Sequence, residues 1–266
     1  MKACYLVFAC MLFFNSSLLA QKMTPFIPEE NPLGVGVIVC PGGSYFWLDK
    51  ETEGIEVAQW LCRNGVAAFV LEYSHGGWAA FAFHLRIRGR SFPSGFLDLS
   101  NALDTVYAHA GDYGIRRDRI GCMGFSAGGH LVMHAAEQLA GNESSMSFVA
   151  PIYPVVSMTH GCTHMRSRRG LLGERPSSDW LDSLSVEHHV PTNCPPVFLV
   201  NCDDDPVVHH HNAELLDSAL TAHNIPHRYE HFRTGGHGFG VSELKTSEEA
   251  IQWKDRFLEW LNDLFN

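Results

Sequence analysis

The segment from 120 to 130 carries the serine best placed to act as a nucleophile. It reads Ile-Gly-Cys-Met-Gly-Phe-Ser-Ala-Gly-Gly-His, which is a short apolar strand, then Gly-x-Ser-x-Gly, then the beginning of a helix. This order predicts a tight, strained strand-to-helix turn that presents the Ser126 hydroxyl at the top of a sheet, above a helix N-terminus. Gly124 and Gly128 lack side chains, so the turn can pack closely against its neighbours. A hydroxyl placed in this way is suited to nucleophilic attack.

A serine nucleophile needs a general base, and a histidine follows the last strand-like run of the chain. The run at 228–232 is followed by Arg-Thr-Gly-Gly-His-Gly-Phe-Gly. The flanking glycines let the loop fold the imidazole back toward the serine. We therefore predict that His237 is the general base and then the acid that protonates the leaving alcohol.

The base in turn needs an orienting acid, which in this architecture follows the serine and precedes the histidine in the chain. Three adjacent aspartates follow the strand-like run at 197–201. We predict Asp205 as the acid, because Asp-Pro-Val-Val after a strand is the usual form of this loop. Asp203 and Asp204 stay open as alternatives, although bonds to loop backbone amides would also explain them.

A glycine-rich loop after the first predicted strand supplies candidates for an oxyanion hole. The run at 35–40 leads into Pro-Gly-Gly-Ser-Tyr, and glycines let backbone N–H groups approach a developing negative charge. We predict donors from Ala127 and from Gly43 or Ser44. The alternative is a plain glycine-rich turn.

Aromatic side chains near the same loop are candidates for contact with substrate. Tyr45, Trp47 and Trp78 lie close to the expected mouth of the site and could stack on sugar rings. Packing beneath the surrounding loops is the alternative for each of them.

Strand-like and helix-like segments alternate from residue 35 to the end of the chain, which predicts an α/β fold. The sheet should be mostly parallel, with about six strands and helices on both faces, and ligands should bind at the carboxyl ends of its strands. Two longer segments, 74–94 and 155–196, follow strands and should overhang the site. The predicted strands are 35–40, 66–72, 119–123, 148–153, 197–201 and 228–232, and the predicted helices are 55–64, 95–110, 128–140, 212–222 and 248–264, with a short one near 179–184.

The composition and the first residues of the chain indicate its partners and its location. A formal net charge of −10 over 266 residues argues against nucleic acid as a partner. Residues 1–20 have a lysine, an apolar stretch and a small-residue exit, which predicts a signal peptide and a secreted or periplasmic protein. The apolar stretch is too short for a membrane span, and no later segment could form one. Residues 21–266 should then form a single catalytic domain.

Metal and cofactor sites are not expected. The chain has no Cys-x-x-Cys pair, and Cys40, Cys122 and Cys202 end or flank apolar strands, where buried free thiols are expected. The consecutive histidines at 209–211 point in different directions, so they cannot all bind one ion. His160, Cys162 and His164 fall in a loop, for which a metal site is also the weaker interpretation.

Seven segments together resemble α/β-hydrolase esterases of the carbohydrate acetylesterase kind, often called acetylxylan esterases. The catalytic domain of the prolyl oligopeptidase group is similar at a greater distance. The resemblance implies triad roles for Ser126, Asp205 and His237. It also implies oxyanion roles for Gly43, Ser44 and Ala127. The segments are CPGGSY at 40–45, GVAAFVLEY at 65–73, RIGCMGFSAGGHL at 119–131, PIYPVVSM at 151–158, LLG at 171–173, DDDPVV at 203–208 and GGHGFG at 235–240.

Two departures from that family concern the loops around the site. Ser44 stands where such proteins usually carry a third glycine, which bears on the oxyanion donor at this position. His209 stands where they usually carry a proline, and the segment 74–94 is longer than is usual. The longer segment bears on substrate preference.

The expected function is that of a cofactor-independent serine esterase that removes acetyl or other short acyl groups from polysaccharide or oligosaccharide. A general short-chain carboxylesterase and a peptidase of the prolyl oligopeptidase type are the alternative enzymes. The chain lacks the large N-terminal domain by which such peptidases select peptides. A non-catalytic carbohydrate-binding protein would not need the complete Ser, Asp and His set.

Overall fold

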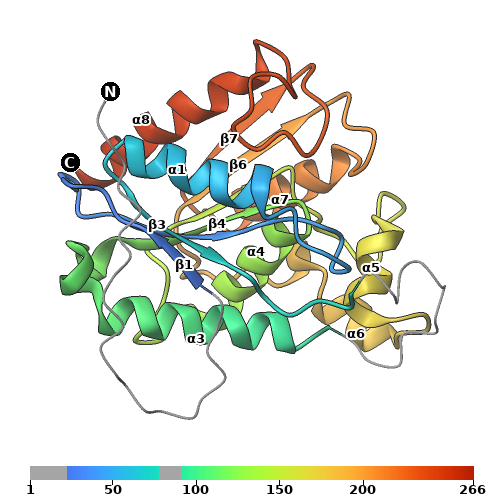
Figure 1. Cartoon of the computed structure of the whole chain (residues 1–266). Coiled ribbons are helices and arrows are strands. Elements are labelled where there is room, and N and C mark those ends of the chain that lie inside the picture. The colour runs from blue at the N-terminus through green and yellow to red at the C-terminus, as the bar shows by residue number, and fades with distance from the viewer. Residues whose placement is uncertain (1–22, 78–90) are drawn as a thin grey trace.

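The computed structural model describes residues 23–77 and 91–266, and all strands of these residues belong to one sheet. Figure 1 shows this sheet crossing the molecule, with helices above and below it. The strand order is β1-β3-β2-β4-β5-β6-β7; β1 pairs antiparallel with β3, and the other neighbours pair in parallel. The strands are β1 (Met23–Phe26), β2 (Gly36–Cys40), β3 (Ala67–Leu71), β4 (Ile120–Phe125), β5 (Val149–Ile152), β6 (Val197–Cys202) and β7 (His227–Phe232).

Helices cover both faces of the sheet, as the alternation of segments predicts. α1 and α8 pack on one face, whereas α3, α4 and α7 pack on the other (Figure 1). A π-helical turn, η1 (Glu51–Ile55), runs directly into α1. The helices are α1 (Glu56–Arg63), α3 (Ser94–Ala108), α4 (Ala127–Leu139), α5 (Met165–Leu172), α6 (Ser178–Ser183), α7 (His211–Ala222) and α8 (Trp253–Phe265).

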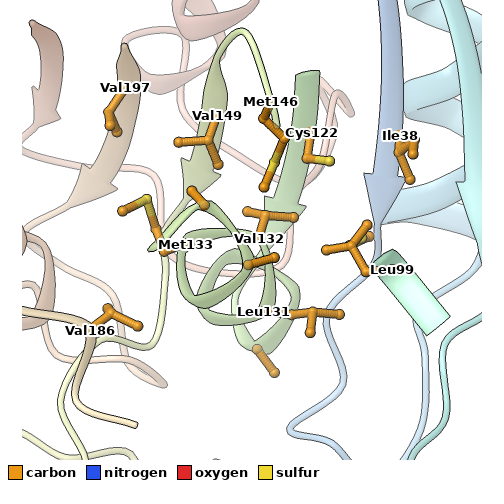
Figure 2. Packing of buried hydrophobic residues seen from close by; sticks show 14 of the residues in the cluster. Ile38, Leu99, Cys122, Leu131, Val132, Met133, Met146, Val149, Val186 and Val197 are labelled. Atoms are coloured by element: carbon orange, nitrogen blue, oxygen red, sulfur yellow. The ribbon is translucent and has the colours of Figure 1, made fainter. Parts of the chain in front are cut away.

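The helix α4 is buried along most of its length, and this fixes the serine that precedes it. Figure 2 shows its side chains, among them Leu131, Val132 and Met133, packed beneath the strands that carry Ile38 and Cys122. Of its thirteen residues, those from Ala127 to Glu137 are all buried. Close-packed surroundings of this kind leave the N-terminus of the helix little freedom to move.

Two elements differ from the sequence-based expectation. β1 is an additional edge strand whose middle residues are exposed, so it lacks the apolar run by which the other strands are predicted. α5 lies inside the predicted loop 155–196; its residues 166–169 are polar, and packing of Gly170 against Ser44 and Tyr45 holds it in place. The signal-peptide prediction and Trp78 lie outside the described residues.

Two further observations bear on the sequence-based expectations. Cys40, Cys122 and Cys202 are buried free thiols, which agrees with their predicted role as small apolar residues, and Cys194 is a further buried free thiol. Among the helices of residues 23–77 and 91–266, none combines the length and the apolar character that a bilayer crossing requires.

Candidate active site

Ser126 lies on a strained turn between β4 and α4. Its backbone has φ 53° and ψ −115°, a region that a residue with a side chain rarely adopts. A Cβ atom on Gly124 would lie 2.1 Å from the Gly128 carbonyl oxygen, and one on Gly128 would lie 2.1 Å from the Cys40 oxygen. The turn therefore requires both glycines. The Ser126 N–H donates to the Ile152 carbonyl, which ties the turn to β5.

The His237 imidazole bridges Ser126 and Asp205, although the three residues are far apart in the chain. Its Nε2 lies 2.9 Å from Ser126 Oγ, and its Nδ1 lies 2.6 Å from Asp205 Oδ2. A carboxylate only accepts hydrogen bonds, so Nδ1 carries the proton and Nε2 is free to accept from the serine hydroxyl. The Asp205 side chain is 1% exposed and that of His237 is 10% exposed. The arrangement can remove a proton from Ser126.

Of the three adjacent aspartates, Asp205 is the one that pairs with His237. Its other oxygen, Oδ1, accepts from the N–H groups of Val207 and Val208 at 2.8 and 2.9 Å, so the carboxylate is held in one orientation. Asp204 Oδ1 accepts from the Gly236 N–H at 2.9 Å and thereby fixes the histidine loop. Asp203 instead bonds to the exposed imidazole of His231.

The loop after β2 turns its backbone toward Ser126. A Cβ atom on Gly42 would lie 2.9 Å from Ser126 Cβ, so the loop and the serine are in contact. Gly43 and Ser44 have φ values of 139° and 56°. The Gly42 N–H donates to Glu53, whereas no hydrogen bond to another described residue occupies the N–H groups of Gly43, Ser44 or Ala127. The N–H groups of the three predicted oxyanion donors are thus free to bind a ligand.

The prediction that Tyr45 contacts substrate is wrong, because its side chain lies in the core. Tyr45 is 1% exposed, and its hydroxyl lies 2.7 Å from His130 Nδ1. His130 Nε2 lies 2.8 Å from the Leu184 carbonyl, so Nε2–H donates there and Nδ1 accepts from Tyr45. Burial lowers the pKa of His130 to about 4, which keeps this imidazole neutral. Trp47, by contrast, is half-buried and stays a candidate.

Sequence reasoning missed His164 as a residue of this neighbourhood. The pKa of His164 is lowered to about 4, first by burial and next by the charge of His237, so the two imidazoles influence each other. Its Nδ1 lies 2.8 Å from Ser167 Oγ. A histidine in a polar, glycine-containing segment gives no periodic signal, so only the folding of α5 against the oxyanion loop reveals its position.

One group of side chains away from the serine has ligand atoms close enough to hold a metal ion. Asp182, His188 and His189 are exposed, and their ligand atoms lie within 4.8 Å of one another. Asp182 Oδ1 is 2.8 Å from His188 Nδ1, and Asp182 Oδ2 is 3.4 Å from His189 Nε2. Hydrogen bonds between these groups account for their proximity without an ion. They do not contact Ser126, Asp205 or His237 through any hydrogen bond within the described part of the chain.

Comparison with known proteins places this geometry in a family. The family model BD-FAE matches residues 27–220, a span that contains Ser126 and Asp205. The chain belongs to the BD-FAE family. His237 lies beyond the matched span, so its place in this BD-FAE protein rests on the hydrogen bonds described above.

Two curated proteins match the BD-FAE chain over most of its length. It is 30% identical over 240 residues to an acetylxylan esterase of Xylanibacter ruminicola, covering 87% of this chain and 46% of that protein. It is 31% identical over 216 residues to endo-1,4-beta-xylanase B of Butyrivibrio fibrisolvens, covering 77% of this chain and 32% of that protein. The chain thus spans less than half the length of either relative.

Solved structures support the α/β-hydrolase fold of the BD-FAE chain. An acetyl ester-xyloside bifunctional hydrolase from Caldicellulosiruptor lactoaceticus superposes with a TM-score of 0.81 and 27% identity, covering 96% of this chain and 92% of that one. A carboxylesterase of Lactobacillus plantarum superposes with a TM-score of 0.74 and 19% identity, covering 94% and 97%. The second likeness bears on the fold alone.

Proposed function

We propose that this BD-FAE protein is a serine esterase that removes acetyl or other short acyl groups from carbohydrate. The observation that carries the proposal is the hydrogen-bonded series from Ser126 through His237 to the buried Asp205. The acetylxylan esterase and xylanase names of the two relatives support an acetylated xylan or a related carbohydrate as the substrate. No cofactor is needed for this chemistry.

In the first half of the reaction, Ser126 Oγ attacks the ester carbonyl carbon while His237 Nε2 takes the serine proton. Asp205 holds Nδ1–H and stabilises the imidazolium that forms. The carbonyl oxygen becomes negatively charged, and the free N–H groups of Ala127 and of Gly43 or Ser44 are the donors that stabilise it. The intermediate then collapses, and His237 gives its proton to the sugar oxygen. The deacylated alcohol departs, and the acyl group remains bound to Ser126 Oγ.

In the second half, a water molecule attacks the acyl-serine. His237 Nε2 takes a proton from the water, and the same backbone N–H groups stabilise the second oxyanion. Collapse releases the carboxylic acid, and the proton on His237 returns to Ser126 Oγ. The histidine therefore acts twice as a base and twice as an acid, which requires both of its hydrogen-bonded partners to stay in place.

Substitution of the serine tests the chemistry. Ser126→Ala should lower kcat for hydrolysis of an aryl acetate by about 10³-fold or more, because the nucleophile is lost. Ser218→Ala, on the exposed face of α7, is the matched control and should keep wild-type turnover. Circular dichroism of both variants shows whether the fold is intact. Unchanged turnover in Ser126→Ala would contradict the assignment.

A substrate panel tests the carbohydrate part of the proposal. Acetate release should be measured from acetylated xylan, acetylated pectin, simple sugar acetates and an aryl acetate. Higher kcat/KM on acetylated carbohydrate than on the aryl ester is the expected result. Activity on aryl esters alone would indicate a general short-chain carboxylesterase, and cleavage of a dipeptide anilide would indicate a peptidase.

Export is the remaining part of the proposal. The charge and apolar pattern of residues 1–20 support a signal peptide and a secreted or periplasmic location. Expression of the full chain in a bacterial host, followed by mass measurement of the exported protein, should give a mature chain that begins near residue 21. Retention of the full-length mass in the cytosolic fraction would contradict export.

A further inference from the structure

Glu53 is a buried carboxylate that the proposed mechanism does not use. It lies in η1, and its side chain belongs to a residue only 3% exposed. An ionised carboxylate is costly to bury unless hydrogen bonds or charges stabilise it. Its neighbours are therefore informative, and both of its oxygens bond to groups that belong to the walls of the active site.

The first bond joins Glu53 to the oxyanion loop. The Gly42 N–H donates to Glu53 Oε2 at 2.7 Å within the interior. Gly42 directly precedes Gly43 and touches Ser126, since an added Cβ would lie 2.9 Å from Ser126 Cβ. The carboxylate therefore fixes the residue that directly precedes Gly43 and Ser44, whose N–H groups are free.

The second bond joins Glu53 to the histidine loop through a tyrosine. The Gly240 N–H donates to the Tyr153 hydroxyl at 3.0 Å, and that hydroxyl lies 2.9 Å from Glu53 Oε1. An N–H group can only donate, so Tyr153 accepts from Gly240 and gives its single proton to Glu53. The Tyr153 ring also lies against the His237 ring, with centroids 4.6 Å apart.

The backbone around Glu53 contacts the same loop. A Cβ atom on Gly240 would lie 2.3 Å from the Thr52 carbonyl oxygen, so η1 and the histidine loop are in close contact. On its other side, Gly240 accepts a hydrogen bond from the buried indole of Trp253 at 3.1 Å. The turn η1 thus contacts two loops that follow β2 and β7, which lie on opposite sides of β4 in the sheet.

We propose that Glu53 is a positioning residue for the esterase reaction, whose two oxygens hold the oxyanion loop and the His237 loop in a fixed relation to each other. The inference rests on the proposed function, because it concerns the donors and the base that this reaction needs. A displacement of about 1 Å between such groups is enough to lower a rate about 100-fold.

Several neighbours favour the ionised form of Glu53. Burial raises the pKa of Glu53, whereas the charge of His237 and the hydrogen bonds from Tyr153 and the Gly42 N–H lower it in part. The groups that favour the carboxylate form thus belong to the segments that its two oxygens join.

The test compares Glu53→Gln, Glu53→Ala and Tyr153→Phe with Glu51→Gln, a control at an exposed position of the same turn. Each enzyme is titrated with a fluorophosphonate, and kcat for an aryl acetate is expressed per reactive serine. Glutamine can keep one of the two accepted bonds, alanine keeps neither, and phenylalanine keeps the ring against His237. We expect kcat to fall about tenfold in Glu53→Gln and Tyr153→Phe and about 100-fold in Glu53→Ala, with KM changed less than about threefold.

A merely structural role would give a different pattern. The inference would be overturned if Glu53→Gln and Tyr153→Phe both kept a kcat per reactive serine within twofold of wild type and showed only a lower Tm and fewer titratable serines. Both variants keep enough contacts to be measured even if Glu53→Ala does not fold. A double variant Glu53→Gln/Tyr153→Phe should lose less than the product of the single losses, because the two residues act through one bond. A strictly multiplicative loss would also count against it. Failure of the proposed function would look different, since wild type itself would then neither hydrolyse esters nor react with the fluorophosphonate.

Discussion

Two aspartate–histidine pairs lie near the carboxyl ends of β6 and β7, and only one of them is buried beside a serine. Asp205 pairs with His237 and Asp203 pairs with His231, with both acids in the segment after β6. The side chains of the first pair are 1% and 10% exposed, whereas those of the second are 41% and 42% exposed. Each pair joins an aspartate to a histidine by a hydrogen bond, through Nδ1 of His237 and through Nε2 of His231, so residue types alone do not distinguish them.

The surroundings act in two ways. Burial removes water that would otherwise screen the carboxylate, so Asp205 can fix and stabilise a charged imidazole, whereas an exposed pair gains little. His237 also has a third partner, the Ser126 hydroxyl, on its second nitrogen. An aspartate beside a histidine is thus not distinctive by itself, and burial next to a serine hydroxyl is what would let the imidazole accept and return a proton.

The largest expected effect separates the two pairs directly. Asp205→Asn should lower kcat for an aryl acetate by about 10³- to 10⁴-fold, because the imidazole loses the acid that sets its tautomer. Asp203→Asn is the matched control and should change kcat less than about twofold, as expected for an exposed pair. The comparison between the pairs fails if both variants lose activity to a similar degree.

The buried bond between Tyr45 and His130 tests, through stability, whether burial makes a histidine hydrogen bond important. Tyr45→Phe removes the hydroxyl that donates to His130 and leaves a buried nitrogen unsatisfied, which should lower the free energy of unfolding by about 1–3 kcal/mol. Urea unfolding measures this change. Because Tyr45 is buried, kcat/KM on acetylated xylan and on an aryl acetate should change by the same factor. A loss confined to xylan would restore a role for Tyr45 in substrate contact.

His134 is a buried histidine that, unlike His237 and His130, has no hydrogen-bond partner for Nδ1 among the described residues. Burial lowers the pKa of His134 from 6.5 to about 3, so between these values the folded protein binds fewer protons than the unfolded chain. Stability is therefore present above pH 6.5 and is lost as the pH falls. The free energy of unfolding, measured with urea, should depend less steeply on pH in His134→Leu than in wild type, by about 1.4 kcal/mol per pH unit between pH 6 and 4. The same slope in both proteins would contradict this account.

The smallest effect concerns the half-buried Trp47. Stacking of a sugar ring on its indole would contribute about 0.5–1.5 kcal/mol, so Trp47→Ala should raise KM for acetylated xylan about two- to tenfold. KM for an aryl acetate should stay within about twofold, since that substrate has no sugar to stack. Equal increases on both substrates would show that Trp47 supports the loop instead of the ligand.

The sequence predicted those parts of the molecule that follow from local patterns. Apolar runs placed six of the seven strands, and the glycines around Ser126 predicted a turn that the structure shows to be too tight for side chains at Gly124 and Gly128. The positions of Asp205 and His237 followed from chain order, because parallel strands bring their carboxyl ends to one edge. The choice of Asp205 over its neighbours agrees with the hydrogen bonds, which assign each aspartate a separate partner.

Features that depend on packing between distant segments could not be predicted. For Tyr45, contact with substrate and packing beneath the loops both stay open from the sequence. Ser44 and Tyr45 both adopt a positive φ, and the Tyr45 hydroxyl bonds to His130 in the core. Glu53 occupies a helix-like segment in which an acidic residue normally faces solvent. Only the contacts with Gly42 and Tyr153 show that it faces the interior.

The bond between the Trp253 indole and the Gly240 carbonyl gives the molecule a built-in optical probe. This tryptophan is fully buried and its ring N–H is attached to the segment that carries His237. Indole emission responds to the polarity and hydrogen bonding around the ring, so the fluorescence lost in Trp253→Phe isolates a signal from this one place. Stopped-flow recording of that signal during acylation would time any movement of the segment without an added label.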